Sequence, residues 1–259
     1  MIPARASSAE AAPEPAAFLD VESSLTGRRW RLRSYDDRVA LAMAQRLGLP
    51  EIVGRVLAAR GVGLDEAAVF LNPTLRALLP DPSVLKDMDA ACERLAAAVM
   101  QNERIAIFGD YDVDGATSAA LLARYLGAAG ARTRVYIPDR LKEGYGPNAP
   151  ALLKLRQEGA SVVVTVDCGT GAHQALADAR DAGLDVIVAD HHEAESALPP
   201  AFAVVNPNRL DDTSGLGQMA AVGVAFLMAV GLNRTLRAAG WFKTRSEPAL
   251  LQWIDLVAL

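Results

Sequence analysis

The strongest constraint on the fold is an alternation of short apolar runs with helical segments that begins near residue 104. The runs are RIAIFGD, TRVYIPD, SVVVTVD, LDVIVAD and FAVVNPN, at residues 104–110, 133–139, 161–167, 184–190 and 202–208. Amphipathic segments rich in alanine and leucine separate several of them, in ATSAALLARYLGAAG, NAPALLKLRQEG and TGAHQALADARDAG. Strands that alternate with helices favour βαβ units with right-handed crossovers. The sequence therefore predicts an α/β fold with a mainly parallel sheet flanked by helices.

Polar side chains gather where these runs end. Four of the five runs end on an aspartate, and the fifth ends on Asn206-Pro207-Asn208. In an open α/β sheet, ligands bind beyond the carboxyl ends of the strands. After the first run, Asp110, Asp112 and Asp114 occupy alternate positions. In an extended chain neighbouring carboxylates of this trio would start about 7 Å apart and repel by roughly 2 kcal/mol. Either water screens them on an exposed loop, or a cation lies among them.

The chain before the first strand has a different texture. Residues 36–103 carry apolar side chains at three- and four-residue spacing in DRVALAMAQRLGL, PEIVGRVLAARGV, LDEAAVFLNP and DMDAACERLAAAVMQN, which predicts helices. The first residues are rich in alanine and proline. We therefore divide the chain into a flexible tail and lead-in at 1–35, a helical region at 36–103, and a catalytic domain at 104–259.

Composition and charge indicate the class of protein and the expected compartment. The chain has 259 residues, of which 51% are hydrophobic and 22% charged, as in a globular protein. It has two cysteines, Cys92 and Cys168, in unrelated contexts, which fits the reducing cytoplasm. We find no secretory leader and no apolar run of the roughly 18 to 20 residues that cross a membrane, so we expect no membrane partner. A net charge of −5 argues against nucleic-acid binding by bulk charge but allows a local basic groove.

Further metal-binding side chains follow two later strands. Asp167 ends the third run, and Asp190, His191 and His192 follow the fourth. Carboxylates with one or two imidazoles suit Mn²⁺ or Mg²⁺ better than a structural zinc. Two such ions can hydrolyse a phosphoester. For any one strand-end aspartate the alternative is a helix cap, and we assign Asp139 to that alternative.

The order of the motifs resembles a known superfamily. GDYDVDGATSAALL, VDCGTGA, ADHHE and VNPN, separated by βαβ lengths, are similar to the first four motifs of the DHH phosphoesterase superfamily. IPDRLKEGYGPN, GQMAAVGVAF and the upstream FLNPTLRALLPDPSVLKDMDAA resemble its RecJ branch of single-strand-specific exonucleases. The resemblance covers roughly residues 40–259.

The resemblance implies roles for individual residues. Asp112 and Asp114 would each hold one divalent ion, Asp167 would bridge both, and His191 would be a further ligand. Asp110 joins the metal set, and Asp190 would orient its neighbours. We expect Asp167 and His192 to be catalytic, with His192 beside the scissile phosphate. The expected substrate-binding residues are His192, Arg140, Lys142, Gly144, Tyr145, Asn206 and Asn208. For Arg140 and Lys142 the alternative is a solvated loop.

The same resemblance implies a function. We expect a cytoplasmic enzyme that hydrolyses single-stranded DNA from 5′ to 3′ in recombination and repair. Its expected partners are single-stranded DNA, a single-strand-binding protein and a helicase. Proteins of this branch continue from a segment like IDLVAL into a Gly-Thr-Val-Ala-Asp motif, whereas this sequence stops at Leu259. We therefore expect the catalytic domain to be truncated before its last motif, and the fragment itself to have doubtful activity.

Three alternatives stay open at this point. One is a small-substrate DHH enzyme that acts on pyrophosphate, oligonucleotides or cyclic dinucleotides, although those relatives favour an upstream His-x-x-Pro-Asp-x-Asp pattern. Another is a haloacid-dehalogenase-type phosphatase. The segment DVDGAT resembles the motif of those enzymes, except that Ala116 stands where they have a threonine. The third is a noncatalytic DNA-binding scaffold built on a DHH domain.

Overall fold

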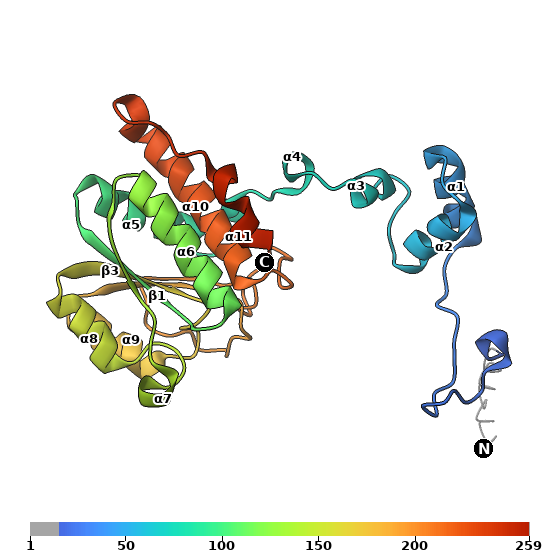
Figure 1. The fold of residues 1–259 in the computed structure, drawn as a ribbon, viewed down its shortest axis with the longest axis horizontal. Coiled ribbons are helices and arrows are strands. Elements are labelled where there is room, and N and C mark those ends of the chain that lie inside the picture. Colours follow the sequence, from blue (N-terminus) through green and yellow to red (C-terminus); the bar gives the residue numbers. More distant parts are fainter. Residues whose placement is uncertain (1–15, 259) are drawn as a thin grey trace, which may run out of the picture. The chain divides into compact units, whose positions relative to one another are not determined.

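The computed structural model describes residues 16–258, which fall into two compact units that divide between Leu79 and Pro80 (Figure 1). Of the predicted tail, residues 1–15 lie outside the described residues. The first unit contains the short helices η1 (Phe18–Asp20), α3 (Ala67–Leu71) and α4 (Leu75–Leu78), and the longer helices α1 (Asp37–Leu47) and α2 (Glu51–Ala59).

Local chemistry sets the helix pair of the first unit. Asp36 begins α1, because its carboxylate accepts hydrogen bonds from the N–H groups of the first turn, and Gly48 ends it at φ +64°. At Gly54 in α2, a Cβ would lie 2.2 Å from the carbonyl oxygen of Ala40 in α1. Only glycine allows this close approach of the two helices, which pack around Met43 and Leu57.

The second unit is built on a parallel sheet. Its elements are η2 (Pro82–Val84), α5 (Met88–Met100), β1 (Arg104–Gly109), α6 (Val113–Ala128), β2 (Arg132–Tyr136), α7 (Arg140–Glu143), α8 (Ala149–Gln157), β3 (Ala160–Val166), α9 (His173–Asp181), β4 (Asp185–Ala189), β5 (Ala203–Val205), α10 (Ala221–Ala238), η3 (Trp241–Lys243), η4 (Leu250–Trp253) and α11 (Ile254–Ala258). The five strands pair in parallel in the order β2-β1-β3-β4-β5. The predicted α/β fold with a parallel sheet is therefore confirmed.

Helices cover both faces of the sheet. In β1, Ile105 and Ile107 pack toward α5, α6 and α10, whereas Ala106 and Phe108 pack toward α8 and α9, on the other side of the sheet in Figure 1. Since successive side chains of a strand point to opposite faces, a strand buried on both sides must be apolar at nearly every position. This explains why the runs of β1, β3 and β4 are nearly continuous, whereas the edge strand β2 carries exposed arginines.

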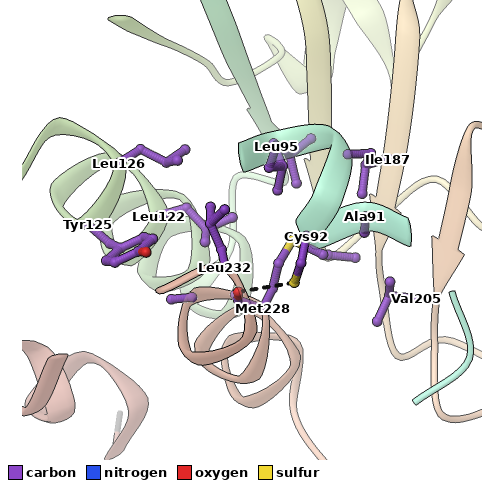
Figure 2. Close-up of a cluster of buried hydrophobic side chains, with 14 of the residues drawn as sticks. Ala91, Cys92, Leu95, Leu122, Tyr125, Leu126, Ile187, Val205, Met228 and Leu232 are labelled. Carbon is purple, nitrogen blue, oxygen red and sulfur yellow. Dashed lines mark hydrogen bonds between the residues drawn. The ribbon is translucent and has the colours of Figure 1, made fainter. Parts of the chain in front are cut away.

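The larger core lies where α5, α6 and α10 meet over the sheet (Figure 2). Burial raises the pKa of the Cys92 thiol to about 12, and its Sγ lies 3.7 Å from the carbonyl oxygen of Met228. Helix α10 is long and apolar enough to cross a membrane by length and composition, but 67% of it is buried inside the protein. We therefore interpret α10 as the core helix of this unit.

Helix α5 packs against the sheet of the second unit. Leu95 and Val99 of α5 lie in the same core as β1 and β3. The compact unit accordingly begins at Pro80, whereas the sequence analysis grouped α5 with the helical region at 36–103. Packing thus moves the structural boundary upstream. The functional division of the chain into domains stays a prediction.

Candidate metal centre

Three aspartates meet at the carboxyl edge of the sheet, the edge at which β1, β3 and β4 end. Asp110, Asp167 and Asp190 follow these neighbouring strands directly, and their exposed fractions are only 3%, 2% and 1%. Side chains able to bind a metal form two groups here, one of Asp110, Asp112 and Asp167, the other of Asp167, His191 and His192. Within each group the ligand atoms lie within 4.8 Å of one another. Asp167 belongs to both groups, so two cation positions would share it.

The backbone at Asp167 is held in an unusual conformation. Its φ is +60°, a value uncommon outside glycine, and its N–H donates to the carbonyl oxygen of Ala189 at 3.1 Å. Burial, then a hydrogen bond with Asp112 and the nearby carboxylates, raise the pKa of Asp167 to about 8. Its Oδ1 lies 3.2 Å from Nε2 of His191. Such strained residues cluster at functional sites.

Asp112 is bound to the first turn of α6. Its Oδ1 accepts the N–H of Gly115 at 3.1 Å, where a Cβ would clash with the backbone of Asp110. Burial raises the pKa of Asp112, but hydrogen bonds from Gly115 and Asp167 outweigh it and leave that pKa below its usual value. Asp112 therefore serves as a helix cap and still faces Asp167. The capping alternative and the metal-binding role are compatible at this residue.

Asp110 provides the test of whether a divalent cation fits. Burial and the neighbouring Asp112 raise its pKa. Its Oδ1 is buried and has no hydrogen-bond partner among the described residues. Buried polar atoms in native proteins nearly always have a partner. A carboxylate oxygen left unpaired beside two further carboxylates is a ligand set of hard oxygens, which Mn²⁺ and Mg²⁺ prefer. The residues present fit a divalent cation.

Asp190 holds the two histidines in place. Its Oδ1 accepts the N–H of His191 at 2.8 Å and lies 2.7 Å from Nδ1 of His192, while its Oδ2 accepts the N–H of Thr170 at 3.0 Å. Burial raises the pKa of Asp190, but the hydrogen bonds from His192 and Thr170 lower it by more, so the net shift is downward. An ionised Asp190 fixes the orientation of His192.

The two asparagines predicted to bind substrate donate hydrogen bonds to the backbone of His191 and His192, the histidine loop. The Asn206 side chain is 0% exposed, and its Nδ2 donates to the carbonyl oxygen of His192 and to Oγ1 of Thr170, both at 2.9 Å. Asn208 Nδ2 donates to the carbonyl oxygens of His191 and Gly217. Asn206 has no surface left to offer a substrate, so for this residue the prediction is corrected. The amide nitrogens of both asparagines therefore donate to acceptors within the protein.

Tyr145 is a predicted substrate residue whose hydroxyl lies beside the imidazole of His192. Its hydroxyl is 3.2 Å from the carbonyl oxygen of Asp167 and 3.4 Å from Nε2 of His192. Gly144, at φ +80°, turns the chain before it. Burial raises the pKa of Tyr145, so the hydroxyl stays protonated. The side chain therefore reaches both the backbone of the shared aspartate and the imidazole of the second histidine.

Arg140 and Lys142, for which a solvated loop was the alternative to substrate binding, lie on the short helix α7. Asp139 caps this helix by accepting the N–H of Leu141 at 3.0 Å, which confirms the capping interpretation of Asp139. The Arg140 guanidinium lies over the ring of Tyr111, 4.4 Å from its centroid. Lys142 Nζ is 3.1 Å from Oδ2 of Asp139. Arg140 thus lies beside the aspartate loop, the segment 110–114 that contains Tyr111. Lys142 forms an ion pair with Asp139 of its own helix cap.

The structure does not bring every predicted ligand together. Asp114 lies in the first turn of α6 and contributes to the raised pKa of Asp167, but its carboxylate belongs to neither group. Two residues of the site were missed, namely Thr170, which contacts Asp190 and Asn206, and Tyr111, which lies under Arg140. Thr170 stands within VDCGTGA, so that motif was the available signal. Cys168 is fully buried.

Comparison with known proteins identifies similar sequences over most of the chain. The family described as "DHH family, N-terminal domain" matches residues 104–259. The RecJ exonuclease of Bacillus subtilis is 38% identical over 204 residues, which cover 79% of this chain and 26% of RecJ. The Dickeya dadantii RecJ is 40% identical over 214 residues, which cover 82% of this chain and 36% of that protein. The Salmonella typhimurium RecJ is 37% identical and covered to 39%. The chain thus spans between a quarter and two fifths of these relatives.

Solved structures of RecJ proteins are also similar to this chain. A crystal structure of RecJ in complex with Mn²⁺ from Thermus thermophilus superimposes with a TM-score of 0.68 at 30% identity, covering 88% of this chain and 30% of that one. A crystal structure of exonuclease RecJ bound to manganese has a TM-score of 0.57 at 36% identity. The match covers 67% of this chain and 42% of that one. With the family match spanning more than half of the sequence, these comparisons show that the chain belongs to the DHH family.

Proposed function

We propose that this chain carries the metal-binding part of an exonuclease that hydrolyses single-stranded DNA from the 5′ end. The observation that carries the proposal is Asp167, a buried carboxylate shared by two groups of metal-binding side chains. Two divalent ions that share one ligand are the arrangement used for in-line displacement at phosphorus. The similarity to RecJ exonucleases supports single-stranded DNA as the substrate class. Direction comes from the family resemblance.

We assign one ion to Asp110, Asp112 and Asp167, and the other to Asp167 and His191. Mn²⁺ or Mg²⁺ at these positions would supply an acidified water as nucleophile and neutralise charge on the phosphate. Crystals of RecJ proteins contain Mn²⁺ or Mg²⁺, which supports these metals. Asp114, which belongs to neither group, is retained as a ligand candidate of lower rank.

His192 is proposed to face the scissile phosphate. Asp190 occupies its Nδ1, so the proton on that nitrogen is fixed and Nε2 faces outward, beside Tyr145. Half of the His192 side chain is exposed, at 49%, so a phosphate can reach it. A protonated Nε2 donates a charge-assisted hydrogen bond to the developing negative charge. Arg140 is proposed to bind a neighbouring phosphate of the strand, and Tyr145 to line its path.

The biological setting is part of the proposal. Recombination and repair in the cytoplasm, with a single-strand-binding protein and a helicase as partners, come from the family resemblance alone. No surface of the described residues identifies these two partners. Single-stranded DNA is the partner that the metal centre itself supports.

The experiment offers three substrates with Mn²⁺ to the whole protein that contains this chain: 5′-labelled single-stranded DNA, the matched duplex, and pyrophosphate. Release of labelled mononucleotide from the single strand alone is the expected result. Preferential hydrolysis of pyrophosphate would overturn the proposal in favour of a small-substrate DHH enzyme. Binding of DNA without hydrolysis of any substrate, at saturating Mn²⁺, would instead favour the scaffold alternative.

A further inference from the structure

A cluster of arginines lies at the amino edge of the sheet, the edge at which β1 and β2 begin. Arg104 of β1 pairs in register with Arg132 of β2, and Ala106 pairs with Arg134. Because alternate residues of a strand share a face, the three arginines project from the same face of the sheet. The amino edge is the opposite end of the strands from the metal centre.

The arginines line a hollow in the surface. Its volume is about 580 Å³, and it is lined by Arg104, Arg132, Thr133, Arg134 and Glu158. Glu158 is the single carboxylate among these lining residues. Arg104 donates to its carbonyl oxygen, and Nε of Arg134 lies 3.4 Å from its Oε2. Arg132 has no hydrogen-bond or ion-pair partner among residues 16–258. The lining therefore carries three guanidinium groups against one carboxylate.

This concentration of charge is costly unless an anion neutralises it. Like charges directly opposite each other on neighbouring strands destabilise a sheet. The whole chain has a net charge of −5, so a local excess of arginine runs against the overall composition. Guanidinium groups bind phosphate through paired N–H donors and match it better than they match most other anions. The chemistry of the hollow is therefore that of a phosphate site.

Further cationic side chains lie between this hollow and the metal centre. A second hollow of about 360 Å³ adjoins Tyr136, at the other end of β2, and its charged lining residues are Lys142, Lys154 and Glu143. Lys154 Nζ lies over the Tyr136 ring, 5.7 Å from its centroid. Beyond it, α7 carries Arg140, which lies beside the aspartate loop. Cations thus follow the outer strand β2 from the amino edge to the metal centre, a pattern that fits one polyanionic strand.

We propose that Arg104, Arg132 and Arg134 form a phosphate-binding site for the backbone of single-stranded DNA, remote from the end that is cleaved. The choice of DNA as the source of the phosphate rests on the proposed function. The site itself depends only on the geometry of the arginines. Its role is to hold the uncleaved part of the strand along β2 while the terminal phosphodiester lies at the metal centre.

The test measures DNA binding without metal, so it does not depend on hydrolysis. A labelled oligodeoxythymidylate of about 20 nucleotides is titrated in EDTA by fluorescence anisotropy at several salt concentrations. The double variant Arg132→Gln/Arg134→Gln should bind about tenfold more weakly, and its salt slope should fall by about 1.4, or about 0.7 for each phosphate that is no longer neutralised. The control Arg124→Gln removes an exposed charge from α6, on the other face of the sheet, and should leave both quantities unchanged.

The remaining outcomes separate this proposal from the proposed function. Equal binding by the double variant and the control would overturn the phosphate site and leave the arginines as charges that keep the outer strand from pairing with other chains. A change in the binding of inorganic phosphate alone, with DNA binding intact, would overturn the DNA assignment. If hydrolysis with Mn²⁺ fails but the arginine-dependent loss of binding persists, the exonuclease proposal fails and the phosphate site stands. Circular dichroism confirms that the variants are folded.

Discussion

The two edges of the sheet both gather like charges, but they handle them differently. At the carboxyl edge, Asp110, Asp167 and Asp190 are almost fully buried. At the amino edge, Arg132 and Arg134 are exposed to water. Burying an ionised group is costly unless a partner compensates it, whereas water screens an exposed one. The acidic edge therefore requires its cations far more than the basic edge requires an anion.

The difference also predicts how each edge responds to its ligand. Removal of metal should destabilise the carboxyl edge and change its protonation. Removal of an anion should leave the amino edge folded and change only what it binds. A buried charge cluster is thus coupled to stability, and an exposed cluster is coupled to affinity. The variants below examine this contrast, beginning with the largest expected effect.

Asp167→Ala should have the largest effect, because it removes the one carboxylate shared by both groups of ligands. We expect the affinity for Mn²⁺ to fall by more than about 100-fold, since even residues behind the ligands are worth about 10- to 100-fold. Hydrolysis of single-stranded DNA should be lost with it. Isothermal titration with Mn²⁺ and a nucleotide-release assay measure the two losses.

The matched control for this variant is Asp181→Ala, which removes an exposed carboxylate in the last turn of α9. It should bind Mn²⁺ like the wild type. If Asp167→Ala also kept wild-type affinity, the assignment of the shared ligand would be wrong. Asp114→Ala, by contrast, should weaken binding much less than Asp112→Ala, because only Asp112 belongs to a ligand group.

The pH dependence of stability should reveal the buried carboxyl next. The pKa of Asp167 in the metal-free fold is about 8, raised from 3.8 by burial first and by Asp112 second. Between these values the native state keeps a proton that the unfolded state has lost, so stability falls as pH rises from about 4 to about 8. In EDTA we expect the Tm to drop by at least about 3 °C between pH 6 and pH 8.

Manganese should reverse this trend. Metal ligands must be deprotonated, so Mn²⁺ binds more tightly as pH rises and stabilises the fold most at pH 8. Asp167→Asn carries no titrating carboxyl and should flatten the EDTA profile. A wild-type Tm in EDTA that rose from pH 6 to pH 8 would contradict the burial argument. Thermal melts followed by circular dichroism provide the measurement.

The sequence predicted the strands and their parallel arrangement because the signal is local. Each buried strand must be apolar on both faces, and each must reach its neighbour through a helical crossover. The convergence of Asp110 and Asp167 at one edge then follows from topology, since parallel strands that neighbour each other end together. These features depend on patterns of a few residues.

The features of the site that the sequence did not predict depend on where the backbone changes direction. The alternation of Asp110, Asp112 and Asp114 assumes an extended chain, but β1 ends at Gly109 and α6 begins at Val113. Residues two apart in a helix do not face each other, so Asp114 departs from the group. Asn206 follows β5 and turns beneath the histidine loop, a tertiary contact that its motif does not encode. Both differences arise where a local rule is extended past the end of its element, and Asp114 stays a ligand candidate of lower rank.

Asn206→Ala should have an intermediate effect and test the corrected role. The change leaves the His192 carbonyl and the Thr170 hydroxyl without their buried donor, at a cost of about 1–3 kcal/mol in stability. Displacement of the histidines should lower kcat by about tenfold with little change in KM for DNA. A large rise in KM at constant kcat would restore the original prediction of substrate binding. Denaturant melts and steady-state kinetics separate the two.

Glu158→Gln should have the smallest effect, and its sign distinguishes the two edges. At the carboxyl edge, removing a carboxylate weakens the binding of cations. At the amino edge, removing the one carboxylate beside Arg134 frees that guanidinium and raises the local positive charge. Binding of oligodeoxythymidylate in EDTA should therefore strengthen by about two- to threefold, equivalent to less than about 1 kcal/mol. Glu93→Gln, an exposed change on α5 and the other face of the sheet, provides the control and should bind as the wild type does. If both variants strengthened binding equally, bulk charge would account for the gain, and the amino edge would lose its claim to a defined site.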